Sequence, residues 1–69
     1  MNPDVFKGRW HQVRGDLRKR WGKLTDDDMT QIEGNAEKMV GKLQERYGLK
    51  REEAEKQINE FLNSTRKTA

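Results

Sequence analysis

Apolar residues recur along this chain at the spacing of helices. Five of them follow one another at steps of four, three, four and four, which places them on one helical face: Phe6, Trp10, Val13, Leu17 and Trp21. A second group also falls on one helical face: Ala36, Met39, Val40, Leu43 and Tyr47. The pattern predicts an all-α fold, a small bundle of four short helices at residues 3–21, 26–33, 35–47 and 51–63. Because only Gly34-Asn35 separates the middle two, one bent helix from 26 to 47 is the alternative.

The chain also carries an internal repeat. Residues 8–33 align with residues 34–59 at a constant offset of 26, which pairs Trp21-Gly22 with Tyr47-Gly48 and Gln31-Ile32 with Gln57-Ile58. The repeat predicts two pseudo-repeated helical hairpins, with Gly22 and Gly48 as left-handed residues that end the first helix of each. It leaves open whether the two copies fold on each other or exchange between chains.

One domain is expected over residues 1–63, followed by a flexible C-terminal tail at 64–69. The expected core consists of Phe6, Trp10, Val13, Leu17, Trp21, Leu24, Met29, Ile32, Met39, Val40, Leu43, Tyr47, Leu49, Ile58, Phe61 and Leu62. A core this small supplies about 3–5 kcal/mol, so the fold should be marginally stable.

The acidic run TDDD, residues 25–28, has two interpretations. As a helix start, the Thr25 hydroxyl accepts a hydrogen bond from the Asp28 amide, and the Asp28 carboxylate accepts one from the Thr25 amide. The other two aspartates place negative charge at the positive end of the helix dipole. As a metal site, three adjacent helical residues point about 100° apart and cannot converge on one ion. We therefore favour capping. In the second copy Lys50 is a poor cap, so the last helix should fray more.

The combination of WGKLTDDDMTQIEG, VGKLQERYG and EEAEKQI resembles the CsbD-like family of small bacterial proteins. The resemblance covers residue 1 to about residue 60. It implies a bundle of four short helices and a role in general stress responses. It supplies no catalytic or binding residues.

Composition argues against catalysis. There is no cysteine, the only histidine is His11, and no glycine-rich phosphate loop is present. So few apolar residues cannot build both a core and a pocket. We expect a non-enzymatic cytoplasmic monomer with no cofactor, metal, membrane span or small-molecule substrate.

The positive charge is concentrated at the start. Residues 1–24 hold seven basic and two acidic residues, whereas the remainder holds eight basic and ten acidic ones. A stripe beside the first apolar face, at steps of four, three and four, is a candidate phosphate- or partner-binding surface: Lys7, His11, Arg14 and Arg18. Alternatively, the stripe is solvated surface paired with later acids.

Three other binding modes fit the sequence less well. Neither 26–33 nor 51–63 presents a basic base-reading face, which argues against sequence-specific DNA recognition. Trp10 and Trp21 lie on the apolar face, so we interpret them as core and not as stacking platforms. Membrane-surface binding would require the first helix to leave the core.

Glycines inside the expected helices need a reason, since each costs about 0.5–1 kcal/mol against alanine. Gly8, Gly15 and Gly41 lie away from the apolar faces. They either hold stability low, relieve crowding where helices cross, admit a partner's backbone, or let the helices melt and reform. We favour the first two. The leading functional hypothesis is a hydrated stress protein that shields or contacts other macromolecules, and the alternative is a weak, sequence-independent nucleic-acid binder.

Overall fold

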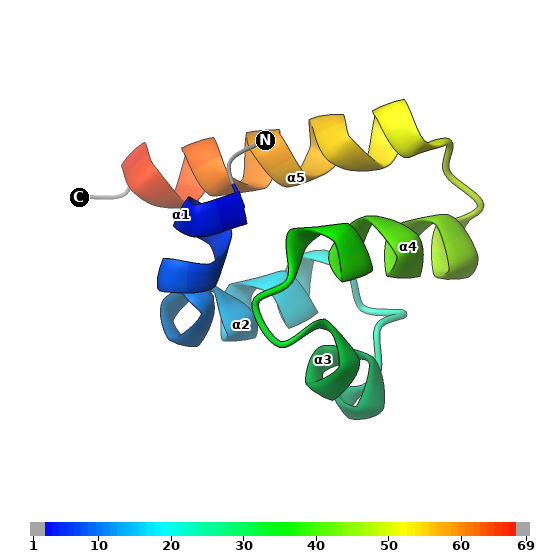
Figure 1. Ribbon diagram of the computed structural model, residues 1–69, viewed down its shortest axis with the longest axis horizontal. Helices are drawn as coiled ribbons and strands as arrows, with labels where there is room; N and C mark the ends of the chain where they lie inside the picture. The colour runs from blue at the N-terminus through cyan, green and yellow to red at the C-terminus, as the bar shows by residue number, and fades with distance from the viewer. Residues whose placement is uncertain (1–2, 68–69) are drawn as a thin grey trace.

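The computed structural model describes residues 3–67, which form five helices (Figure 1). They are α1 (Pro3–Gly8), α2 (Trp10–Arg20), α3 (Asp26–Ile32), α4 (Ala36–Tyr47) and α5 (Arg51–Lys67). No strand occurs among these residues, so the all-α prediction is confirmed. The expected number of four helices is wrong by one. Whether the halves are two repeated hairpins stays a prediction.

The predicted first helix, 3–21, is broken at Arg9. Arg9 has φ −107° and ψ 9°, outside the helical region, and α2 begins at the next residue. The break turns α1 onto α4 and α2, and it buries Phe6 completely. Sequence periodicity missed the break because Phe6, Trp10 and Val13 keep helical spacing across it.

A tight turn separates α3 from α4, so the alternative of one bent helix is wrong. Glu33 ends α3 with φ 33° and Gly34 follows with φ 78°, both left-handed. Asn35 then caps α4, because its side chain accepts from the Lys38 amide at 3.2 Å. Gly34 suits this turn because residues with a side chain rarely adopt its backbone conformation.

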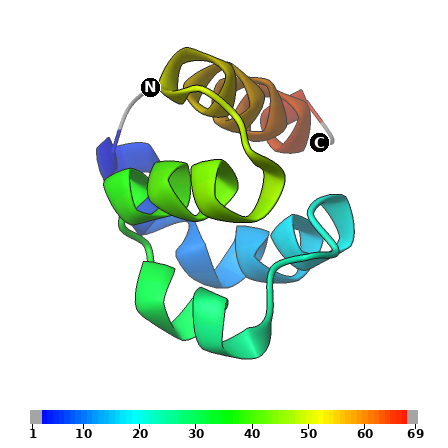
Figure 2. The same ribbon diagram turned by 90° about the vertical axis from the view of Figure 1, so that its right-hand side faces the viewer.

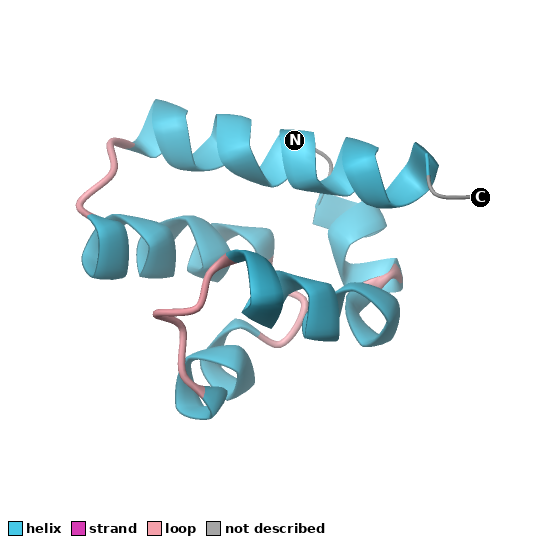
Figure 3. Cartoon of the chain, turned by 180° about the vertical axis from the view of Figure 1, so that it is seen from behind, coloured by secondary structure: helices cyan, strands magenta, loops and turns pink. Residues whose placement is uncertain are grey.

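Helix α4 lies at the centre of the molecule. It packs against α1, α3 and α5, and in two views it lies between α5 on one side and α2 with α3 on the other (Figures 1 and 2). A short loop joins α4 to α5, which runs back over it in the opposite direction (Figure 3). Helix α5 continues to Lys67, four residues past the predicted end at 63. The mobility of the predicted tail stays a prediction, and its residues 68 and 69 lie outside the described residues.

The loops resemble each other only in part. Gly48 is left-handed as predicted, with φ 66°, but Gly22 is not, because α2 ends at Trp21 with φ −117°. Before α5, the Lys50 amide donates to Glu53 Oε1 at 2.9 Å. Only half of a capping box is present there, since a lysine side chain offers no acceptor.

The core agrees closely with the predicted set. Fourteen of the sixteen predicted residues are buried, whereas Tyr47 and Leu49 are partly buried against them, and Ala36 and Ala54 join the core. Two edge-on aromatic pairs lie within it, Phe6 with Trp10 at 5.5 Å and Trp21 with Phe61 at 5.2 Å between ring centres. Because aliphatic residues of α3 and α4 pack with these rings, all five helices contribute to the core.

Three glycines lie in open space. A Cβ atom added at Gly8, Gly15 or Gly41 would meet no atom of the described residues within 4 Å beyond the local helix. Relief of crowding between helices, one of the two favoured explanations, is therefore wrong for these positions. Low helix stability, close approach by a partner's backbone, and melting and reforming of the helices remain as explanations.

Candidate interaction surface on the second helix

The aspartate run starts α3, and the capping prediction is confirmed. Thr25 Oγ1 accepts from the Asp28 amide at 3.1 Å, and Asp28 Oδ2 accepts from the Thr25 amide at 3.0 Å. Both exposed neighbours, Asp26 and Asp27, lie in the first turn, where negative charge favours the helix dipole.

Asp28 has a second role that the sequence did not predict. Its side chain is fully buried, and Arg46 of α4 binds both carboxylate oxygens, Nε to Oδ2 at 3.1 Å and Nη2 to Oδ1 at 3.0 Å. Lys42 Nζ lies 3.2 Å from Oδ1. Two cations from α4 thus neutralise a carboxylate of α3, and they occupy the oxygens that a metal would need.

These contacts hold the pKa of Asp28 far below its ordinary value. The hydrogen bonds from Arg46 are the main cause and the Thr25 amide is next, while burial acts in the opposite direction. Since Arg46 is 18 residues away in the sequence, no local signal announces the pair. The only hint is that Lys42 and Arg46, one helical turn apart, share a face of α4.

The four predicted binding residues are all exposed, but the structure divides them. Lys7 lies on α1, whereas His11, Arg14 and Arg18 lie on α2 beyond the break at Arg9. The spacing that joined them assumed one continuous helix. Only the α2 members can form one surface along a single axis.

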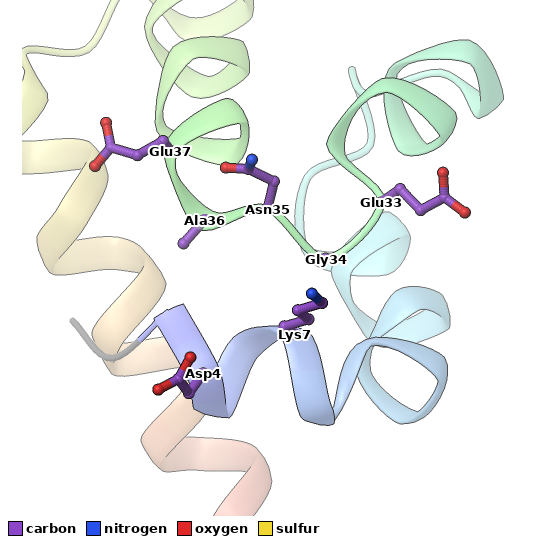
Figure 4. A pocket seen from close by; sticks show the side chains of 7 residues that line it. All are labelled: Asp4, Lys7, Glu33, Gly34, Asn35, Ala36 and Glu37. Atoms are coloured by element: carbon purple, nitrogen blue, oxygen red, sulfur yellow. The ribbon is translucent and has the colours of Figure 1, made fainter.

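Lys7 lies in an acidic setting. It lines an open hollow of about 280 Å³ at the turn between α3 and α4, together with Asp4, Glu33, Gly34, Asn35, Ala36 and Glu37 (Figure 4). Its side chain points toward the Gly34 turn, as the same view shows. Three of these lining residues are acidic, which disfavours an anionic ligand at this place.

Helix α2 carries the basic surface. The helix contains one acidic residue, Asp16, and four basic residues: Arg14, Arg18, Lys19 and Arg20. Arg18 forms an ion pair with the exposed Asp26 at the start of α3. Arg20 lies over the Trp21 ring, 5.4 Å from its centre. We call His11, Arg14, Arg18 and Lys19 the α2 surface.

The remaining candidates are structural. Trp10 and Trp21 are 8% and 3% exposed, and Trp21 Nε1 donates to Gln57 Oε1 of α5 at 3.1 Å, so the core interpretation is confirmed. Among residues 3–67, no group of three His, Asp or Glu side chains is arranged to hold a metal ion. Within the same range, no helix combines the length and apolar character needed to cross a membrane.

Sequence comparison now places the chain. The CsbD-like family model matches residues 4–56. The chain belongs to the CsbD-like family. It is 54% identical over 61 residues to the UPF0337 protein PA4738 of Pseudomonas aeruginosa, covering 88% of this chain and 94% of that protein. Over 58 residues it is 53% identical to the UPF0337 protein YjbJ of Escherichia coli strain K12, covering 84% of each.

A third relative is similar over nearly the same length of the chain. A UPF0337 protein of Bordetella pertussis is 46% identical over 63 residues, which is 91% of this chain and 96% of that protein. The predicted membership is confirmed. No solved structure matches the chain.

Proposed function

We propose that this CsbD-like protein is a non-enzymatic protein of the bacterial general stress response, which acts in the cytoplasm by shielding or contacting other proteins. The family match over residues 4–56 carries the proposal. Two features of the fold support it. The apolar side chains whose burial the structure describes are almost all in the core, and the exposed surface is rich in charged side chains.

Protection of a client protein tests the proposal. The purified chain is added in increasing amounts to an unrelated heat-labile enzyme, and residual activity after heating is measured. We expect protection that rises with concentration and exceeds that from an equal mass of an unrelated folded protein. Equal protection by both would contradict the proposal, as would substrate turnover by the chain that a single substitution abolishes.

Weak, sequence-independent binding of nucleic-acid phosphates is the second candidate. The excess of cations on α2 favours it, and Arg14 makes no ion pair with any described residue. Such binding falls steeply as salt rises, because each phosphate contact releases counterions. The surface would therefore bind a short DNA duplex at low salt and lose most of that binding near 0.15 M, where screening acts over about 8 Å.

Charge reversal separates the two functions. Arg14→Glu with Lys19→Glu should abolish amide shifts induced by the duplex while leaving client protection unchanged. Lys7→Glu with Lys56→Glu makes the same change in net charge and is the matched control, because Lys7 lies beside acidic residues and Lys56 is exposed on α5. An equal loss of binding in the two double variants would indicate net charge alone and would remove the α2 surface as a site.

A further inference from the structure

The junction of α1 and α2 combines a broken backbone with an unbroken sequence pattern. Phe6, Trp10, Val13 and Leu17 would share one face of a continuous helix, yet the helix stops at Gly8 and restarts at Trp10. Neither proline nor a left-handed residue forces this break. The residue between the helices is Arg9, and arginine is not a residue type that usually caps or ends a helix.

The backbone at Arg9 holds the start of α2 without help from a side chain. The Arg9 carbonyl accepts from the amides of Gln12 and Val13, both at 2.9 Å, but no side-chain cap is present. Its φ of −107° and ψ of 9° are a moderate rotation away from helical values. Straightening the junction therefore breaks no capping contact.

Tertiary contacts keep α1 bent. Phe6 is fully buried beside Trp10, and the Gly34 turn receives the α1–α2 corner, with a Cβ built at Gly34 3.5 Å from both Lys7 Cα and Trp10 Cβ. A helix of six residues is not stable alone in water. Helix α1 is therefore stable only where it is packed, as it is here against α4 and α2.

We propose that α1 is an exchangeable arm through which two copies of this chain form a swapped dimer. Residues 3–20 straighten into one helix, Phe6 leaves its own core, and α1 of the second copy fills the emptied site. An unfilled site of that size is costly, so the straight form is stable only when a partner arm occupies it. A second copy supplies the matching arm by identity, and the exchange is reciprocal about a two-fold axis.

Gly8 fits this exchange. It is the last residue of α1, and a Cβ there would meet nothing within 4 Å in the docked form. The balance between the two forms can therefore be changed at residues 8 and 9 without disturbing the core. The proposal concerns assembly and does not depend on the proposed stress function.

Two substitutions with the same charge change test it. Arg9→Ala favours a continuous helix, whereas Arg9→Asn favours a new helix start. Sedimentation equilibrium should give a dimerisation constant on the order of tenfold higher for Arg9→Ala than for Arg9→Asn. Equal constants, or monomers only in both variants up to millimolar concentration, would overturn the proposal.

The position of the arm in the dimer is the second measurement. Labelled and unlabelled chains are mixed, unfolded and refolded together, and isotope-filtered NOE spectra are recorded. Contacts between Lys7 of one copy and Gly34 of the other are expected, whereas a dimer with these contacts only within each chain would refute arm exchange. Should Arg9→Ala not fold, as judged by circular dichroism, Gly8→Ala replaces it and is compared with the natural sequence.

Discussion

At the scale of single residues, Asp28 is a buried side chain that connects two helices. It joins the cap of α3 to two cations of α4, and it is the only buried charged residue among those whose burial the structure describes. The sequence was sufficient to predict the cap, because Thr25 and Asp28 are three residues apart. It was not sufficient for the pair with Arg46, since a contact across 18 residues depends on how the helices fold together.

Removing the charge of Asp28 should destabilise the whole domain. For Asp28→Asn we expect a loss of about 2–3 kcal/mol in the free energy of unfolding, because charge-assisted hydrogen bonds are lost and Lys42 stays largely buried. Urea unfolding followed by tryptophan fluorescence measures it. Asp27→Asn is the control, an exposed neighbour whose loss should matter little. Similar midpoints for the two variants would refute the structural role of Asp28.

The same carboxylate should make stability depend on pH in the acid range. Its pKa is depressed in the folded state, so its contribution is fully present above the ordinary aspartate value of 3.8 and is lost as pH falls below it. Unfolding midpoints measured from pH 7 to pH 3 should therefore drop steeply only below about pH 4. The drop should be shallower in Asp28→Asn, and parallel curves would assign it to other carboxylates.

At the scale of elements, local sequence determines where most helices form and end, whereas the break between α1 and α2 depends on tertiary packing. Thr25, Asn35 and Gly48 mark three helix ends through local chemistry, and all three act as such in the structure. The end at Gly8 carries no comparable signal, and it accompanies the packing of α1 on the distant α4 and the burial of Phe6 in the core. Gly22 shows the reverse case: it could adopt a left-handed conformation at the end of α2, but its φ is not positive in the structure.

Glycine substitutions should have opposite signs at different places in the same helix. Gly41→Ala, within α4, is expected to stabilise by about 0.5–1 kcal/mol, because its Cβ has open space and glycine weakens helices. Gly48→Ala, at the end of α4, should destabilise by about 1–2 kcal/mol, since its φ of 66° is left-handed. Thermal and urea unfolding of both variants provide the measurement. If Gly41→Ala were destabilising, that glycine would have a packing role that the open space does not indicate.

At the scale of the whole molecule, α4 holds the fold together because it contacts α1, α3 and α5. Helix α1 is its weakest attachment, since it is the shortest helix and relies on Phe6. Native-state hydrogen exchange should show amides of α4 opening only with global unfolding, while those of α1 open at a lower free energy. Equal protection in α1 and α4 would mean that the arm never separates from the core, and it would weigh against exchange as well.

The pair of Asp28 and Arg46 also bears on how the chain is made. During synthesis the first half leaves the ribosome before the second, so the carboxylate emerges 18 residues ahead of its guanidinium partner. Until then, docking Asp28 into an apolar interior would bury an unpaired charge. A nascent chain that ends before Arg46 should therefore stay open, and the domain should acquire its structure only after Arg46 has left the ribosome.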